Sequence, residues 1–338
     1  MTQPLRIALL GAGTVAQTYL DVIASNPAIA TLAAVAEPDP SRMRAVVDRF
    51  GVEGFHDLHE LLDVADTVGV EAVIVCTPPV THATLSAAAL ERKMAVLCEK
   101  PMAPNRPGLH MMLDAAERSG ARLMMASTFR YAADVRAAKT LIDDGVLGDV
   151  VLFRASFSTP VAMRGRWNAR PEISGGGVII DAGTHAVDVV RYLLGPIRNV
   201  VAAETRRLQG LPVEDTAQLM LRTEGGASGT VDVSWSLHAT DPWYLTIEGT
   251  KASLRLGWES SELHLGTGWE RFGDGFDRVA AFTGVLTDFV DSVRFGKEPI
   301  IDAADARASV AVIDAAYRSI QTGSWVRVVE ERRSQSRG

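Results

Sequence analysis

The sequence predicts a protein of two domains, a doubly wound parallel α/β domain followed by an α+β domain with an open, mainly antiparallel sheet. Over the first 128 of its 338 residues, short apolar runs alternate with helical patterns, which is the rhythm of a parallel sheet. From Val150 onward, strand-like runs follow one another across short glycine-rich turns, which indicates antiparallel pairing. We therefore expect domains at 1–128 and 129–330, with a flexible polar tail at 331–338.

The expected strands of the first domain are short apolar runs separated by helical patterns. They are LRIALL (5–10), LAAVAE (32–37), AVIVC (72–76), AVLC (95–98) and ARLMMA (121–126). The helical patterns cover 14–24, 42–49, 82–91, 109–118 and 132–143. In the second domain we expect strands at 150–158, 199–208, 216–223, 229–237, 244–248 and 252–258, and late helices at 279–295 and 303–321.

Charge and composition exclude several classes of protein. With 41 acidic and 34 basic residues, the chain carries a formal charge of −7, which would repel a nucleic acid or an anionic membrane surface. No apolar stretch reaches the ~18 residues that a membrane helix needs. Cys76 and Cys98 each end an apolar run, so we expect buried, reduced thiols and a cytoplasmic protein. No zinc-ligand spacing occurs, so we expect no metal.

A glycine-rich turn directly follows the first expected strand. Residues 11–16, GAGTVA, fit the pattern G-x-G-x-x-G/A between a strand and a helix. Such glycines let the chain turn sharply and let a pyrophosphate approach the free N–H groups of the helix N-terminus. The sequence thus predicts a Rossmann domain that binds a dinucleotide, with a merely structural turn as the alternative. The expected cofactor-binding residues here are Gly11, Gly13, Thr14, Val15 and Ala16.

Glu37 indicates which dinucleotide is bound. It ends the second expected strand, 24 residues after Gly13, close to the ~20-residue interval typical of the acid that binds the adenosine ribose. Its carboxylate would repel a 2′-phosphate, and residues 38–41 offer no cation to bind one, so NAD is favoured over NADP. Arg42 directly follows this segment and is a cation near enough to bind a 2′-phosphate, so NADP stays the less favoured cofactor. For Glu37 itself, the alternative is a solvated acid at the start of a helix.

Polar residues also gather where two further strands end. The segments CTPPVTH (76–82) and EKP (99–101) stand at the carboxyl ends of their strands, where ligands bind in open α/β sheets. Lys100 beside Glu99 is also compatible with an ordinary surface ion pair. Its place at a strand end, before a proline, favours a site.

A third polar element lies on a helix in the second domain. In GGGVIIDAGTHAVD (175–188), helical spacing places Asp181, His185 and Asp188 within roughly 60° of one another, opposite an apolar face. The alternative is a polar stripe that simply faces water.

These four motifs, in this order, resemble the Gfo/Idh/MocA family of NAD(P)-dependent oxidoreductases over the whole chain. The resemblance implies a C-terminal domain whose sheet often forms the interface of an oligomer, here a homodimer or homotetramer. It also implies hydride transfer between nicotinamide and a carbon of a sugar, cyclitol or related polyol. The family's catalytic lysine maps onto Lys100, and its D-x-x-x-H pair maps onto Asp181 and His185.

The resemblance further implies where cofactor and substrate bind. The additional cofactor-binding residues expected are Thr77, Pro78, His82, Glu99 and Lys100. The expected substrate-binding residues are Lys100, Arg130, Tyr131, Trp167, Asn168, Asp181 and His185. Three arginines in the segment 163–170 hint at a carboxylate or phosphate on the substrate, with a solvated loop as the alternative. His238, Trp243 and Tyr244 are further candidates, equally compatible with packing in the sheet.

The three catalytic candidates also make chemical sense. Oxidising an alcohol requires a base of near-neutral pKa at the hydroxyl, which suits His185. The Lys100 ammonium would stabilise a developing alkoxide, with Asp181 as positioner. These roles can be exchanged, because coupled groups share protons. Two other functions stay open: a glycosidase of this family that uses bound NAD transiently, and a sugar or dinucleotide sensor without turnover.

Overall fold

The computed structural model describes residues 3–329, so the expected tail at 331–338 lies outside the described residues. The N-terminal domain is a six-stranded parallel sheet in the order β3-β2-β1-β4-β5-β6. Its inner strands are almost entirely buried because helices cover both faces. The strands are β1 (Leu5–Leu10), β2 (Ala30–Ala36), β3 (Glu53–Phe55), β4 (Ala72–Val75), β5 (Ala95–Glu99) and β6 (Leu123–Ala126).

The helices α2, α3 and α5 begin at residues whose side chains cap them. The Asp39 and Asp57 carboxylates and the Asn105 side chain accept N–H bonds from the first turns of their helices. The helices are α1 (Thr14–Ser25), α2 (Pro40–Phe50), α3 (Leu58–Val68), α4 (Pro79–Glu91) and α5 (Arg106–Ser119). Sequence reading missed β3 and α3, because β3 is only three residues long, partly exposed and contains Gly54.

The second domain is a nine-stranded sheet in the order β14-β13-β12-β11-β7-β10-β9-β8-β15. It is mainly antiparallel, as expected, but β7 and β10 pair in parallel. The connections between the strands explain this. A helical crossover joins β7 to β8, and β9 and β10 then each run antiparallel to the strand before them, so β10 has the same direction as β7. The strands are β7 (Val150–Ser158), β8 (Ile197–Glu204), β9 (Thr216–Thr223), β10 (Ser228–Ser234), β11 (Trp243–Gly249), β12 (Ser253–Gly257), β13 (Ser261–His264), β14 (Trp269–Gly273) and β15 (Val326–Arg327).

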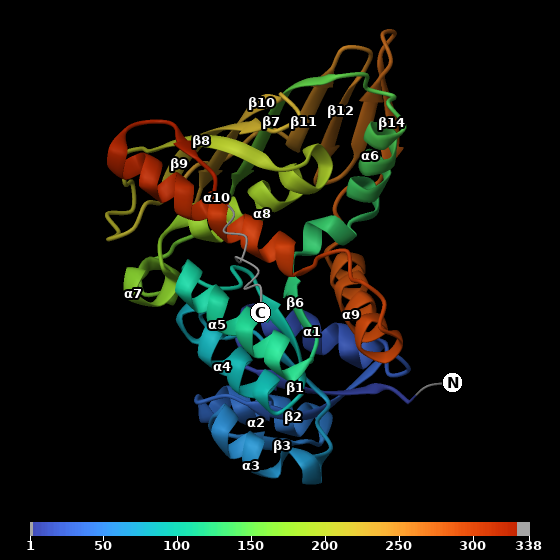
Figure 1. Cartoon of the computed structure of the whole chain (residues 1–338), viewed down its shortest axis with the longest axis vertical. Coiled ribbons are helices and arrows are strands. Elements are labelled where there is room, and N and C mark those ends of the chain that lie inside the picture. Colours follow the sequence, from blue (N-terminus) through green and yellow to red (C-terminus); the bar gives the residue numbers. More distant parts are fainter. Residues whose placement is uncertain (1–2, 330–338) are drawn as a thin grey trace, which may run out of the picture.

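Helices lie against one face of this sheet and join it to the first domain (Figure 1). α8 and α10 pack on the sheet, whereas α9 lies beside α1 and contributes Phe282, Leu286 and Phe289 to the core of the first domain. That core therefore includes a helix from far along the chain. The helical segments are η1 (Thr128–Tyr131), α6 (Ala133–Asp143), η2 (Trp167–Ala169), α7 (Pro171–Ser174), α8 (Val178–Leu194), α9 (Arg278–Phe295) and α10 (Ala303–Thr322).

The part of the chain that the structure describes contains neither a membrane-spanning helix nor a metal-binding cluster. None of the helices within residues 3–329 combines the length and apolar character needed to cross a bilayer. In the same range no group of three or more His, Cys, Asp or Glu side chains is arranged to hold a metal ion. Cys76 and Cys98 are both buried and free.

Candidate active site

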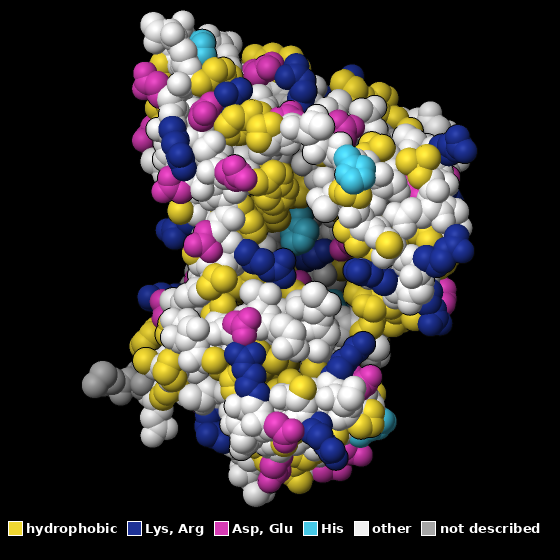
Figure 2. Space-filling model, turned by 180° about the vertical axis from the view of Figure 1, so that it is seen from behind, with side chains coloured by type: hydrophobic (Ala, Val, Ile, Leu, Met, Phe, Trp, Pro, Cys, Tyr) yellow, Lys and Arg dark blue, Asp and Glu magenta, His cyan; other side chains and the backbone are white. Residues whose placement is uncertain are grey.

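A cleft of about 550 Å³ lies between the carboxyl edge of the parallel sheet and the second domain. The glycine-rich turn, the ends of β4 and β5, η1, α8 and the start of α9 all contribute to its wall. Figure 2 shows a hollow between the two domains, with a histidine in it, hydrophobic side chains above it and basic side chains on both sides. This is where the crevice rule for open α/β sheets places a ligand.

The glycine-rich turn has the shape that a dinucleotide requires. Gly11 has a φ of +85°, and a Cβ there would lie 3.0 Å from Thr77 Cγ2 and 3.1 Å from the Cys76 backbone. Gly13 is the N-cap of α1, no side chain caps that end, and a Cβ there would meet nothing within 4 Å. The first turn of α1 therefore presents free N–H groups to an open space, which fits a pyrophosphate.

The other residues of the turn divide between the cleft and the core. Thr14 and Val15, both predicted to bind the cofactor, line the cleft together with Gly13. Ala16 is fully buried and packs in the domain core, so its small size serves the contact between α1 and the sheet.

The Glu37 side chain lies next to the glycine-rich turn. Its carboxylate accepts the Ala12 N–H at 2.6 Å and the Asp39 N–H at 3.0 Å, and the residue is 5% exposed. The negative charge is thus fixed beside the glycine-rich turn, at the end of β2 where an adenosine ribose would bind.

Lys100 and Asp181 form an ion pair across the two domains. The Lys100 Nζ donates to Asp181 Oδ1 at 2.6 Å and to the Asp181 main-chain oxygen at 3.1 Å. The other carboxylate oxygen accepts the Trp235 Nε1–H at 3.2 Å. Burial acts to raise the pKa of Asp181, but the Lys100 charge and these hydrogen bonds outweigh it, so the pKa is lowered. Asp181 is therefore an anion that holds the ammonium in place.

Glu99 lies beneath this pair. It is 7% exposed, and its carboxylate accepts the Tyr19 O–H at 3.1 Å and the Lys100 N–H at 3.1 Å. Burial raises the pKa of Glu99, and the charge of Lys100 only partly offsets this. Glu99 thus borders the cleft, as predicted, and also fixes the main chain at Lys100.

His185 lies one helical turn after Asp181 and faces the same cleft. The Phe129 ring packs edge-on against it, with centroids 5.3 Å apart. Its Nδ1 is buried without a hydrogen-bond partner, so Nε2 is the nitrogen left to meet a substrate. Burial, and then the Lys100 charge, hold the pKa of His185 well below its usual range, so the imidazole is neutral near pH 7 and able to accept a proton.

Two residues predicted to bind the cofactor, His82 and Pro78, do not line the cleft. His82 is 1% exposed, and its ring nitrogens lie 2.9 Å from the Pro101 oxygen and 2.7 Å from the Thr77 oxygen. It does not line the cleft but braces the two strand ends that do. Pro78 is the N-cap of α4 and is also absent from the cleft wall, whereas Thr77 lines it.

Arg130 and Tyr131 do not reach the cleft, contrary to the prediction. The Arg130 guanidinium is 3% exposed and pairs with Asp188 at 2.6 Å and with Asp305 at 2.8 Å. The Tyr131 hydroxyl donates to Asp288 at 2.6 Å. The polar stripe of α8 therefore serves two sites. Asp181 and His185 face the cleft, whereas Asp188 is fully buried in an ion cluster with Arg130.

The segment 163–170 contributes several side chains to the cleft. Trp167 and Asn168 line it as predicted, and so does Arg166. The two other arginines of this segment are absent from the cleft wall. Of the remaining candidates, Tyr244 is fully buried in the second core, and Trp243 stacks on Arg255.

An aromatic wall and a cation in the cleft were missed by sequence reading. Several of the rings stack or meet edge-on around His185, and a single aromatic residue carries no local signal that distinguishes a cleft from a core. Trp235, which binds Asp181, was missed for the same reason. The missed lining residues are Phe129, Phe157, Trp258, Phe276, Arg278 and Phe282.

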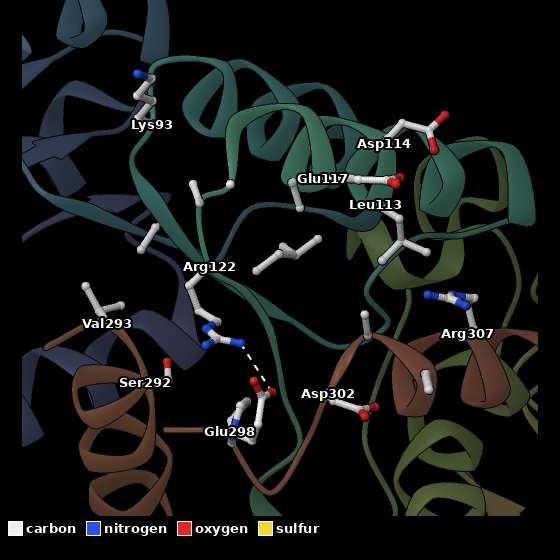
Figure 3. Close-up of a pocket in the computed structure, with 18 of the residues that line it drawn as sticks. Lys93, Leu113, Asp114, Glu117, Arg122, Ser292, Val293, Glu298, Asp302 and Arg307 are labelled. Carbon is white, nitrogen blue, oxygen red and sulfur yellow. Dashed lines mark hydrogen bonds and ion pairs between the residues drawn. The ribbon is translucent and has the colours of Figure 1, made fainter. Parts of the chain in front are cut away.

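A second and larger cavity, of about 1120 Å³, lies elsewhere in the molecule. It lies between α5 and β6 on one side and the ends of α9 and α10 on the other, and the Arg122–Glu298 ion pair bridges it at 3.4 Å (Figure 3). No residue predicted to bind cofactor or substrate borders it. The three predicted catalytic residues, Lys100, Asp181 and His185, line the smaller cleft instead.

Two family models match the chain, one for each domain. Residues 5–127 match an oxidoreductase family with an NAD-binding Rossmann fold, and residues 135–255 match the GFO/IDH/MocA C-terminal domain. The chain belongs to the Gfo/Idh/MocA family. The predicted family, fold class and enzyme class are thereby confirmed, as is NAD as the cofactor of the family's first domain.

Individual members of the Gfo/Idh/MocA family match over most of the chain. Inositol 2-dehydrogenase of Streptomyces avermitilis is 28% identical and aligns with 97% of this chain and 95% of its own. D-apiose dehydrogenase of Rhizobium rhizogenes is 26% identical over 88% of this chain and 90% of its own. The structure of levoglucosan dehydrogenase in complex with NADH superposes with a TM-score of 0.89 at 23% identity, covering 97% of this chain and 100% of that one. The last of these establishes the shared fold.

Proposed function

We propose that the protein is an NAD-dependent dehydrogenase that transfers a hydride between nicotinamide and a secondary alcohol or ketone of a sugar or cyclitol. The observation that carries this is the meeting of the Lys100–Asp181 pair with neutral His185 in one cleft, beside the glycine-rich turn. Relatives named inositol 2-dehydrogenase and D-apiose dehydrogenase support the substrate class.

Three residues of the cleft have separate roles in the oxidation of the alcohol. His185 accepts the hydroxyl proton at Nε2, because its low pKa keeps the ring neutral. The Lys100 ammonium lies next to the oxygen on which negative charge develops and stabilises it. Asp181, held by Trp235, keeps that ammonium in position. The aromatic wall excludes water from one side of the substrate.

The first domain carries the residues that would hold NAD. The uncapped start of α1 would bind the pyrophosphate, and Glu37 would bind the ribose hydroxyls while repelling a 2′-phosphate. When bound, NAD supplies the acceptor for the hydride, so alcohol plus NAD gives ketone, NADH and a proton.

A panel of inositols, aldoses, aminoglycosides and nucleotide sugars, assayed by NADH absorbance with NAD and NADP, tests this function. Net formation of NADH with a panel member is the expected result. Cleavage of a glycoside without net NADH would instead indicate the transient-oxidation mechanism. Binding of sugars or NAD without any turnover would indicate a sensor.

We also propose that the protein is a homodimer or homotetramer assembled through the open sheet. Leu152 on β7 and Met220 on β9 are 42% and 39% exposed on the face away from α8 and α10. An apolar side chain on an uncovered sheet face favours a partner subunit. Light scattering should give a multiple of the chain mass, and Leu152→Glu with Met220→Glu should reduce it. A monomer at micromolar concentration would contradict the proposal.

A further inference from the structure

Two arginines in the cleft have no carboxylate partner within the described part of the chain. Arg166 precedes η2 and Arg278 begins α9, and both line the same cleft as Lys100 and His185. The charge of Lys100 is balanced by Asp181 at 2.6 Å. Within residues 3–329, no Asp or Glu lies at ion-pair distance from either arginine. Neither guanidinium therefore has an ion-pair partner within residues 3–329, and the carboxylate that the charge of Arg278 influences at longer range is the buried Glu99 of the same cleft.

Arg278 is held in place by neutral contacts. Its guanidinium lies 5.2 Å from the centroid of the Phe282 ring and donates to Thr18 Oγ1 at 3.2 Å. A cation at the first position of a helix opposes the helix dipole, and the carboxylate of the N-cap Asp277, which accepts the Ala280 N–H at 3.0 Å, offsets this cost. After burial and Lys100, the charge of Arg278 further lowers the pKa of His185, so its field reaches the catalytic end of the cleft.

Arg166 stands out from its neighbours in the same segment. Arg170 donates to Glu172 at 2.9 Å, and both side chains are 61% exposed. Arg164 does not line the cleft, whereas Arg166 lies there with Trp167 and Asn168. Basic side chains flank the hollow on both sides in Figure 2. The cleft is therefore basic on two opposite sides.

We propose that the substrate is an acidic polyol, whose carboxylate or phosphate binds Arg166 and Arg278 while its reacting hydroxyl lies at His185. This rests on the proposed dehydrogenase function and adds the chemical class of the substrate. A planar guanidinium binds both oxygens of such a group at once, which a lysine does not. The pyrophosphate of the cofactor competes with the substrate anion for Arg278. Arg278 donates to Thr18, which lies one helical turn after Thr14 at the start of α1, where the pyrophosphate would bind. Arg166 lies before η2, in a different segment of the second domain from Arg278.

Binding measurements on the enzyme saturated with NADH test the proposal without turnover. Calorimetric titrations would compare the affinities of anionic and neutral compounds that share the same ring. One set is D-glucuronate, a glucose phosphate and D-glucose, and the other is an inositol and its phosphate. At least one anion should bind about tenfold or more tightly than its neutral parent, as expected for a charge-assisted hydrogen bond. The carboxylate and phosphate members show which anion is preferred. No preference for either anion would overturn the proposal.

Three variants identify the residues responsible. Arg166→Gln and Arg278→Gln should each weaken binding of the preferred anion about tenfold and leave the neutral parent unchanged. Arg164→Gln, in the same segment but outside the cleft wall, is the matched control and should change neither. If Arg278→Gln weakens NADH binding and leaves the anion unaffected, Arg278 serves the cofactor and the proposal is wrong.

The same preparations separate this proposal from the proposed function. Tight binding of an anion without NADH formation from any panel member would reject the dehydrogenase and keep the anion site. Equal oxidation of acidic and neutral substrates would keep the dehydrogenase and reject the anion site.

Discussion

Replacing Lys100 by methionine separates its part in catalysis from its part in holding the cleft together. The change removes the ammonium that lies 2.6 Å from Asp181 Oδ1 and leaves that carboxylate with the Trp235 hydrogen bond alone. Breaking a fully buried pair costs about 3–5 kcal/mol. Because the Asp181 side chain is 28% exposed, we expect a smaller loss in the free energy of unfolding, about 1–3 kcal/mol.

Turnover should fall further than this loss of stability explains. Removing one donor to a developing oxyanion lowers turnover by about 10²- to 10³-fold. Adding Asp181→Asn removes the uncompensated charge, so stability should recover while turnover stays low. Lys139→Met is the matched control: Lys139 pairs with Asp143 on the exposed surface of α6, where such pairs contribute about 0–1 kcal/mol. It should change neither quantity measurably.

The assay is steady-state formation of NADH, with denaturant unfolding measured on the same preparations. Near-normal turnover in Lys100→Met would refute the assignment of Lys100 to the reacting oxygen. Recovery of both turnover and stability in the double variant would refute it as well, since the lysine would then act only through the fold.

The low pKa of His185, caused first by burial and then by Lys100, should place the acid limb of kcat/KM below the usual histidine value of about 6.5. His185→Ala should lower turnover about 10²- to 10⁴-fold and remove that limb; a limb above the usual value would contradict this. Because the unfolded chain takes up the proton that folded His185 resists, the free energy of unfolding should decrease as pH falls below about 6.5. Glu37→Gln should raise the affinity for NADP relative to NAD, and an unchanged ratio would count against the role of its charge. Arg130→Met should lower the free energy of unfolding by about 3–5 kcal/mol, against about 0–1 kcal/mol for Arg118→Met in an exposed pair; equal losses would show that the buried cluster is not structural.

The sequence by itself determined the features that depend on neighbours along the chain. Gly11 and Gly13 identify the turn: few residues other than glycine adopt the φ of +85° at Gly11, and Gly13 leaves open space at the start of α1. The end of an apolar run locates Lys100 at the edge of the sheet, and helical spacing puts Asp181 and His185 on one face of α8. Parallel strands bring their carboxyl ends to one edge, so these separate motifs already implied a single site.

Tertiary packing decided what covers each of those faces. Asp188 shares the polar stripe of α8, yet Arg130, 58 residues away along the chain, buries it in an ion cluster. Arg278 reaches the cleft only because α9 returns to pack beside α1. Periodicity states which side chains share a face of an element, but it contains no information about the element that packs against that face. For this reason the proposed catalytic set could be predicted from local patterns, whereas the aromatic wall, the second cation and the position of Arg130 outside the cleft depended on contacts between distant segments.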